Sequence, residues 1–259
     1  MKATSHLAIL SLALICILLR AESSLEQTPH LSLNLLTCLY NETNKKRADE
    51  YIFCLEKHRN HPMIEHIHVS YDTSHDSGKK GELHRYLEQC ENVSISYIDG
   101  RQTFGDCIRL ANELFPDQYV LLTNADIWFN DTLFKLKPHH LEKKLIALTR
   151  QHWPWNYSQD TWIFKTPFPE HPFMDKTYIG LLSCEKPIIY TAQKNDIHAY
   201  NPKRSIQCMH KHQSHVRNQT EVNRWGIIPL PFCTLEAAYK KAPPKKQPTK
   251  KKAESKSSS

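Results

Sequence analysis

The segment Tyr119-Val-Leu-Leu-Thr-Asn-Ala-Asp-Ile-Trp-Phe129 consists of two apolar runs separated by a polar break. The first run has the composition of a short buried strand, and the break, residues 123–126, follows at its carboxyl end. Ligands of open α/β sheets bind outside the carboxyl ends of the strands. A carboxylate placed there costs free energy unless a cation pairs with it. We therefore predict that Asp126 binds a divalent metal ion carrying a diphosphate; a cap or turn role is the plainer alternative.

Apolar and amphipathic segments alternate through the first half of the chain. They predict elements in the order β-α-β-α-β-α-β at residues 31–39, 44–58, 64–71, 81–90, 93–98, 103–115 and 119–122. Such alternation requires a parallel sheet with right-handed crossovers and helices on both faces. The predicted fold class is therefore α/β, a three-layer α/β/α sandwich with a mostly parallel central sheet. Neither GxGxxG nor a P-loop motif follows the first strand, which argues against a Rossmann dehydrogenase or a P-loop enzyme.

The second half of the chain is less regular. We predict strands at residues 145–148, 158–165 and 186–190. Three prolines between residues 167 and 172 indicate a surface loop, because proline cannot donate to a central ladder.

The amino-terminal residues 1–24 differ from the body of the chain. Their apolar run, Leu7 to Leu19, has 13 residues, whereas a membrane span needs about 20. We predict a cleaved signal peptide, with a signal anchor as the alternative because Arg20 interrupts the usual cleavage region.

The carboxyl-terminal residues 239–259 are rich in lysine. Eight lysines and one acid follow Tyr239, which accounts for the whole net charge of +7. This composition predicts a disordered, solubilising tail; a weak contact with a membrane surface is the alternative. The rest of the chain then sums to zero, so the body at residues 25–238 has no basic excess, which argues against nucleic-acid binding.

Cysteines and glycosylation sequons give weaker information. Seven cysteines remain after the first segment, so at least one is unpaired or pairs between chains. Cys38, Cys54 and Cys107 fall at core-facing positions, which predicts small buried thiols. Five Asn-x-Ser/Thr sequons are sites for glycans if the host is a eukaryote.

Other side chains suit the chemistry of a metal-diphosphate site, although each also has an ordinary structural explanation. Asp160 is either a general base or a residue that starts a strand. His210-x-His212 has the spacing of one strand face and suits a metal such as Mn²⁺; histidine-rich segments are otherwise mostly surface. Three arginines next to strand ends are candidates for diphosphate binding or surface ion pairs: Arg47, Arg101 and Arg217.

In their order along the chain these motifs resemble the GT-A glycosyltransferases that use nucleotide sugars. The resemblance is closest to bacterial-type and algal family-2-like members that carry Asn-x-Asp-Ile and Ser-Gln-Asp-x-Trp-Ile-Phe. It covers about residues 31–220, and the matching segments are 36–42, 101–103, 124–127, 158–164, Asn201-Pro, His210-x-His212 and Arg217.

The resemblance implies roles for the matching residues. Thr37, Asn41, Glu42 and Asp72 would line the nucleoside pocket, and Arg101 would lie near the base or diphosphate. Asn124 and Asp126 would hold Mn²⁺ or Mg²⁺, with His210 or His212 as a late ligand. Asp160 would be the acceptor-side base of an inverting enzyme. Asn124 replaces the first carboxylate of the family's Asp-x-Asp motif.

The predicted function is transfer of a sugar from a nucleotide-diphosphate donor to a hydroxyl acceptor. The signal segment and the sequons together favour the lumen of the ER or Golgi, or secretion. The alternative is a secreted sugar- or nucleotide-binding protein that uses the same fold without catalysis. A nucleotidyltransferase, which would release pyrophosphate, is a third hypothesis.

Overall fold

The structure is a computed structural model that describes residues 31–74, 76, 81–181, 183–214 and 228–239. The predicted signal segment, Arg217 and the tail beyond residue 239 lie outside these residues. The fold presented here is that of the compact unit Ser32–Ser259. In the described part of this unit, no helix is both long enough and apolar enough to cross a membrane.

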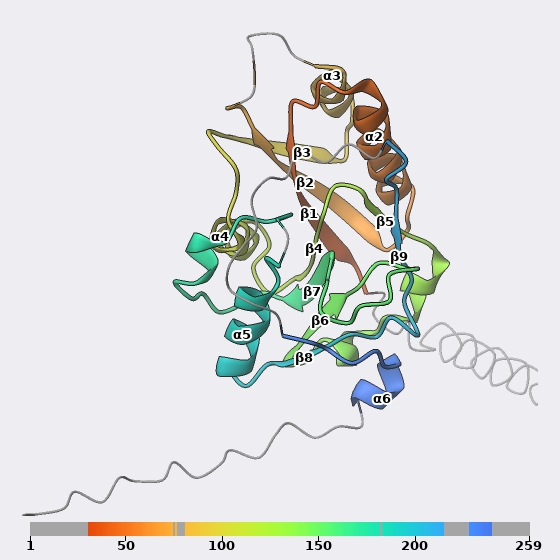
Figure 1. Ribbon diagram of the computed structural model, residues 1–259, viewed down its shortest axis with the longest axis vertical. Coiled ribbons are helices and arrows are strands. Elements are labelled where there is room, and N and C mark those ends of the chain that lie inside the picture. The colour runs from red at the N-terminus through yellow and green to blue at the C-terminus, as the bar shows by residue number, and fades with distance from the viewer. Residues whose placement is uncertain (1–30, 75, 77–80, 182, 215–227, 240–259) are drawn as a thin grey trace, which may run out of the picture. The chain divides into compact units, whose positions relative to one another are not determined.

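A seven-stranded sheet forms the centre of the fold (Figure 1), with the strand order β3-β2-β1-β4-β7-β6-β8. The strands β1 to β4 are mutually parallel, β7 is antiparallel to both of its neighbours, and β8 is parallel to β6. The sheet is therefore mostly parallel, as predicted. The strand bounds are β1 Leu33–Tyr40, β2 Ile64–Asp72, β3 Val93–Ile98, β4 Tyr119–Thr123, β6 Lys144–Leu148, β7 Thr161–Lys165 and β8 His198–Tyr200.

Helices cover both faces of the sheet, which confirms the predicted α/β class and its layers. Figure 1 shows α2 and α3 on one side of the sheet and α4 and α5 on the other. Thr103 forms a capping box with Asp106 at the start of α4, as its sequence predicts. The helix bounds are α2 Lys45–Arg59, α3 Glu82–Glu88, α4 Phe104–Leu114, α5 Lys186–Lys194 and α6 Leu235–Tyr239, with 3₁₀ turns η1 Asp131–Lys135, η2 Pro138–His140 and η3 Met174–Lys176.

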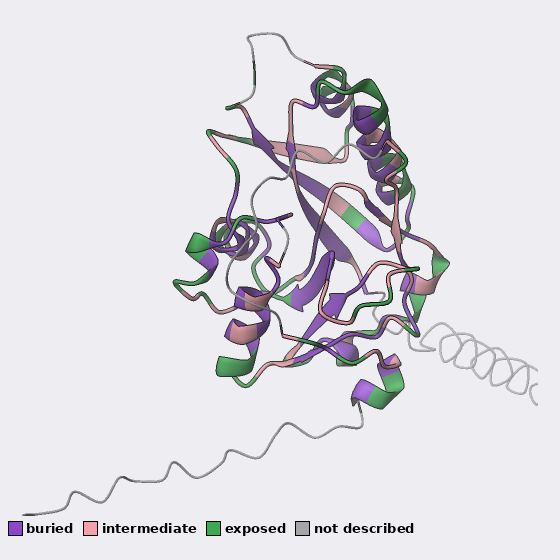
Figure 2. Ribbon diagram, in the orientation of Figure 1, coloured by how far each residue is buried: buried purple, intermediate pink, exposed green. Residues whose placement is uncertain are grey.

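The hydrophobic core lies on both faces of the central strands, which are buried along their length (Figure 2). Val120, Leu121 and Leu122 of β4 are fully buried, because β1 and β7 flank this strand. On the side of α4, the rings of Phe104 and Trp162 meet edge to face with centroids 4.8 Å apart.

One predicted strand is wrong. Residues 186–190 begin the helix α5 instead of forming a strand. Pro187 occupies the first turn, where its missing N–H costs no hydrogen bond. Ile188, Ile189 and Ala192 are fully buried, so one face of the helix packs on the core. The short apolar run read as a strand is therefore the inner face of a helix.

A second, two-stranded sheet lies beyond the end of β4. It pairs β5, Ile127–Phe129, antiparallel with β9, Cys208–His210. This pairing places Ile127 opposite His210, so the histidine-rich segment lies beside the polar break that follows β4.

Candidate metal and active site

The turn between β4 and β5 positions Asp126. Residues 124–126 connect the two strands, and the N–H of Ile127 donates to the carbonyl of Asn124 at 3.2 Å. The carbonyl of Asp126 accepts the N–H of Lys211 at 2.8 Å, which continues the β5–β9 pairing. Asp126 is thus a turn residue and also lies beyond the carboxyl end of β4. This position fits both predictions for it, the metal ligand and the turn residue.

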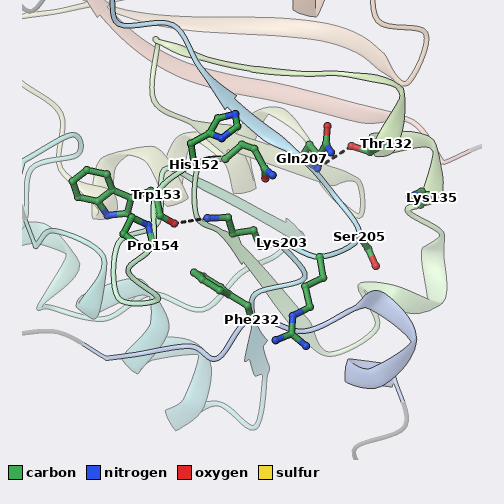
Figure 3. Close-up of a pocket in the computed structure, with 11 residues that line it drawn as sticks. Thr132, Lys135, His152, Trp153, Pro154, Lys203, Ser205, Gln207 and Phe232 are labelled. Carbon is green, nitrogen blue, oxygen red and sulfur yellow. Dashed lines mark hydrogen bonds between the residues drawn. The ribbon is translucent and has the colours of Figure 1, made fainter.

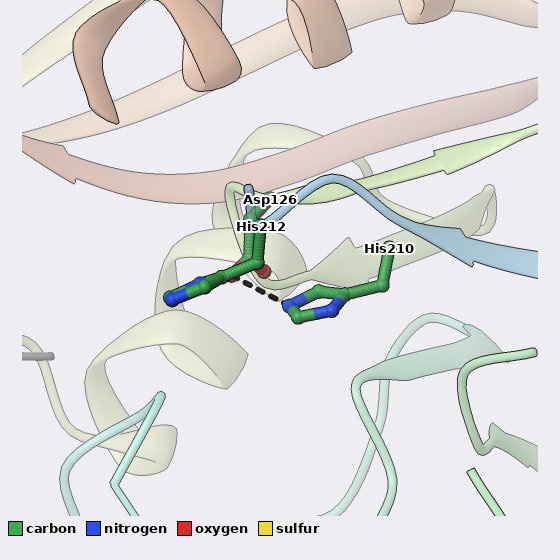
Figure 4. A group of neighbouring side chains, drawn as sticks. All are labelled: Asp126, His210 and His212. Atoms are coloured by element: carbon green, nitrogen blue, oxygen red, sulfur yellow. Dashed lines mark hydrogen bonds and ion pairs between the residues drawn. The ribbon is translucent and has the colours of Figure 1, made fainter. Parts of the chain in front are cut away.

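Two histidines approach one oxygen of the Asp126 carboxylate (Figure 4). His210 Nε2 lies 3.0 Å from Oδ2, and His212 Nδ1 lies 3.6 Å from the same atom. The two imidazole rings stack with centroids 5.3 Å apart. The structure therefore brings together the three residues predicted to bind metal, across more than 80 positions of sequence.

Arg47 makes the shortest contact with this carboxylate. Its Nη2 donates to Asp126 Oδ2 at 2.7 Å, and its Nη1 donates to Glu50 Oε2 at 2.8 Å. Its Nε donates to the hydroxyl of Tyr51 at 3.1 Å. The arginine side chain is only 10% exposed. Arg47 therefore pairs with two buried carboxylates, which sequence alone did not predict.

Glu50 connects α2 to the histidine-rich segment. It accepts the backbone N–H groups of Gln213 and Ser214, the latter at 2.6 Å, and the hydroxyl of Ser214 at 3.0 Å. Because Arg47 and Glu50 lie one turn apart on α2, this helix fixes both the carboxylate and the segment that carries the histidines.

The pKa of Asp126 reflects these contacts. Burial by itself would raise it, but the hydrogen bonds of His210 and His212 and the charge of Arg47 outweigh burial and hold the pKa well below its usual range. The carboxylate is therefore ionised at neutral pH and available as a ligand.

The donor set fits a first-row divalent metal ion. One carboxylate oxygen and two imidazole nitrogens, from Asp126, His210 and His212, lie within 4.8 Å of one another. Mn²⁺ accepts both ligand types, and two histidines with one carboxylate also suit Fe²⁺. Because Arg47 already binds Oδ2, a metal ion needs either the other carboxylate oxygen or a displacement of the arginine.

Asp160 lies beside this cluster, immediately before β7. Its Oδ1 accepts from Arg150 Nη1 at 3.2 Å and from Asn124 Nδ2 at 3.3 Å. Burial raises the pKa of Asp160 despite the charge of Arg150, and the negative charge of Asp126 adds to the increase. The amide of Asn124 therefore holds the candidate base, while its predicted role as a metal ligand stays a prediction.

Glu185 is a second buried carboxyl group near Asp160, and sequence reasoning missed it. It precedes α5 and is 7% exposed. Burial, together with the charge of Asp160, raises the pKa of Glu185 to about 7. The interpretation of 186–190 as a strand concealed this position; recognising Pro187 as a helix-start signal would have indicated it.

Most of the predicted nucleoside residues lie at the carboxyl ends of β1 and β2 and bind protein groups. Thr37 donates to the carbonyl of Thr123 at 2.9 Å. Glu42 accepts the hydroxyl of Tyr40 at 2.8 Å. Asp72 accepts the N–H of Ser74 at 2.8 Å and that of Gly100 at 3.0 Å, so it holds two loops of this edge together.

The remaining predicted residues occupy the same edge of the sheet. Asn41 is partly buried and lies against Gly81, where a side chain would collide with its Oδ1. Arg101 is exposed and donates from Nε to the carbonyl of Ile179 at 3.2 Å. A side chain at Gly180 would contact both Arg101 and Asn124, so this glycine leaves space between them. Arg217 is outside the described residues.

Two adjoining cavities open beside the cluster. One of about 390 Å³ is lined by residues 150–153, Met209, His210 and His212. The other, of about 570 Å³ (Figure 3), shares Gln151, His152 and Trp153 with it and extends to Lys203 and Phe232. The two histidines of the cluster therefore face a space with room for part of a substrate.

No family model matches this chain, and no curated protein does. Solved structures show weak likeness. A mannosyltransferase from Pyrobaculum calidifontis, in complex with GDP-Man and Mn²⁺, matches with a TM-score of 0.47 and 11% identity. The match covers 78% of this chain and 65% of the mannosyltransferase chain. A Drosophila galactosyltransferase mutant with manganese, UDP-Gal and xylobiose has a TM-score of 0.42 and 11% identity, covering 74% and 77%. A putative glucose-1-phosphate thymidylyltransferase from Bacillus anthracis has a TM-score of 0.41 and 7% identity, covering 66% and 87%.

Proposed function

We propose that this protein is a metal-dependent glycosyltransferase that moves a sugar from a nucleotide-diphosphate donor to a hydroxyl acceptor. One observation carries the proposal: a carboxylate and two imidazoles, Asp126, His210 and His212, converge at the carboxyl end of β4, beside two cavities. This edge of an open α/β sheet is where nucleotides bind.

The donor set would hold Mn²⁺ or Mg²⁺, which when bound neutralises the charge of the leaving diphosphate. Arg150 lines the cavity that holds the two histidines, and its Nη1 lies 3.2 Å from Asp160 Oδ1. Its charge partly opposes the effect of burial on the pKa of Asp160, and its position suits an anionic donor group.

Asp160 is our candidate for the base that takes the proton of the acceptor hydroxyl. A buried carboxylate with a raised pKa is a stronger base than an exposed one, and Asn124 and Arg150 fix its position. Glu185 is the alternative base, because its pKa of about 7 matches proton transfer near neutral pH.

The cellular setting is part of the proposal. The signal segment at residues 1–24 and the sequons favour the lumen of the ER or Golgi, where pumped nucleotide sugars are present, or secretion. The lysine-rich tail at residues 239–259 would make at most a weak membrane-surface contact.

A donor panel tests the activity. The full chain is incubated with UDP- and GDP-sugars, with and without Mn²⁺, and release of nucleoside diphosphate is measured. We expect release from one donor class that depends on the metal. Absence of release from every donor, together with absence of metal-dependent nucleotide binding, would overturn the proposal.

The second candidate function is binding of a sugar or nucleotide without catalysis. Two observations favour it: Arg47 already neutralises Asp126, and Asn124, which bonds to Asp160, replaces a second acidic ligand. Donor binding without release in the same panel would identify this function. Release of pyrophosphate from a nucleoside triphosphate and a sugar phosphate would identify a nucleotidyltransferase instead.

A further inference from the structure

The larger cavity carries a concentration of positive charge that the proposed transfer does not explain. Lys135, Lys203 and Arg204 line it, and no acidic side chain of the described residues does. Outside the lysine-rich tail the chain as a whole is neutral, so three cations at one cavity are a local feature. Clustered positive charge at a concave surface attracts an anionic ligand.

Lys203 is the best-placed of these cations. It lies between Trp153 and Phe232 (Figure 3), donating to the carbonyl of Trp153 and placing its Nζ 4.7 Å from the ring centre of Phe232. It is partly buried, and burial lowers its pKa, although the charge of Asp160 partly opposes this. The ammonium group therefore meets a ligand in a partly desolvated position, where a charge-assisted hydrogen bond is strong.

The cavity also offers aromatic surface. Trp153 and Phe232 both line it, and aromatic rings stack on the apolar faces of sugars. A bound sugar could therefore contact both rings while its charged group meets the cations.

The position of the cavity relates it to the acceptor and not to the donor. It shares residues 151–153 with the cavity of His210 and His212, but those histidines do not line it. A ligand there would lie next to the donor site, and Lys203 in this cavity is close enough to Asp160 to feel its charge, so an acceptor hydroxyl bound there can approach the candidate base.

We propose, on the basis of the proposed function, that this cavity binds an acidic acceptor: a carbohydrate whose sugar carries a carboxylate, sulfate or phosphate group. Lys203 and Arg204 bind the anionic group, and Trp153 and Phe232 contact the sugar ring. Neutral acceptors lack a partner for these cations, so the cavity selects for charge. Lys203 and Arg204 are thereby residues that determine acceptor specificity.

Binding of an oligosaccharide panel to the full chain tests this assignment. The panel contains a neutral oligosaccharide and matched versions with a uronate, a sulfate ester or a phosphate ester, measured by calorimetry and by quenching of tryptophan fluorescence. We expect at least one acidic member to bind about tenfold more tightly than the neutral one, and increasing salt to reduce that preference. The three acidic arms identify which anion is preferred.

Substitutions of the cavity cations test which residues produce the preference for acidic oligosaccharides. Lys203→Gln and Arg204→Gln should each weaken acidic binding about tenfold and leave neutral binding unchanged. Lys46→Gln, at an exposed position on α2, is the matched control and should change neither. Equal binding of neutral and acidic members, or an unchanged preference in both cavity variants, would overturn the assignment.

The donor panel separates this inference from the proposed function. Metal-dependent donor release with no preference for acidic acceptors would overturn the acceptor assignment alone. Acidic binding that depends on Lys203, without release from any donor, would confirm the anion site and overturn its role in transfer.

Discussion

Asp126 and Asp160 are two carboxyl groups at the same edge of the sheet, the first partly buried and the second buried, and their surroundings differ. Asp126 has Arg47 and two histidines around one oxygen, and its pKa is lowered. Asp160 has the side chains of Arg150 and Asn124, and burial prevails, so its pKa is raised. The balance between burial and these hydrogen-bond and charge partners therefore moves the two pKa values in opposite directions.

This difference is the basis for the two roles proposed above, a metal ligand and a general base. A group that stays ionised over the whole physiological pH range is suited to ligation, whereas a group that gains a proton more readily is suited to proton transfer. The four predictions below test these surroundings by replacing Asp126, Arg47, Asp160 or Glu185, one residue at a time.

Asp126→Asn should have the largest effect on activity. The amide cannot supply the charged ligand, so we expect donor turnover to fall about 10³-fold and Mn²⁺ binding to be lost. Turnover and calorimetric titration with Mn²⁺ measure the two effects. Asp117→Asn is the control, because Asp117 is exposed and its positive φ suits asparagine. Full activity in Asp126→Asn would refute the ligand role.

Arg47→Met should destabilise the metal-free protein and increase the stabilisation that Mn²⁺ provides. Loss of the guanidinium leaves Asp126 and Glu50 buried without its charge, so the metal-free protein should lose about 3 kcal/mol of unfolding free energy. Mn²⁺ should then stabilise the variant more than the wild type, because the competing cation is absent. Urea unfolding with and without Mn²⁺ measures both.

The matched control for this prediction is Arg109→Met. Arg109 pairs with three carboxylates, but it is 45% exposed, so its loss should cost under about 1 kcal/mol. An equal gain from Mn²⁺ in wild type and Arg47→Met would show that the arginine does not compete with the metal.

Asp160→Asn should reduce kcat about 10²-fold, while the KM for the donor changes little. Asp99→Asn, at an exposed position, serves as the control. The reduction should be accompanied by loss of the acidic limb of the pH profile of kcat. If Glu185→Gln instead removes that limb and Asp160→Asn does not, Glu185 is the base.

Glu185 should make stability depend on pH. The native state keeps the proton up to a pKa of about 7, whereas the unfolded chain releases it near 4.5. The native state therefore binds more protons between these values, so the contribution of Glu185 to stability is greatest below pH 4.5 and falls as pH rises through 7, by about 3 kcal/mol. Unfolding of wild type and Glu185→Gln across this window should show the slope only in wild type, and Glu170→Gln, an exposed control, should retain it.

Local sequence patterns predicted most of the sheet. The β4 strand was identifiable because its apolar run ends in a polar break, and both properties survive in the structure. The run at 186–190 was misassigned, because five apolar and polar residues fit a strand or a helix face until the core against which they pack is known.

The candidate site was only partly predictable. Asp126, His210 and His212 could be named from residue chemistry, but their meeting depends on the β5–β9 pairing, which no local pattern specifies. The contact of Arg47 with Asp126 depends on how α2 packs beside β5, so the sequence offered only diphosphate binding or a surface ion pair for this arginine. Of the cysteines expected in the core, Cys54 and Cys107 are buried and Cys38 is partly buried.

The small β5–β9 sheet lies outside the hydrogen-bonded ladder of the seven-stranded sheet. Two of the three metal-ligand candidates belong to it or follow it directly: His210 ends β9, and His212 lies two residues later. Substitution of either histidine would therefore change the candidate ligand set without touching any strand of the large sheet. In this architecture the choice of ion can be altered separately from the scaffold.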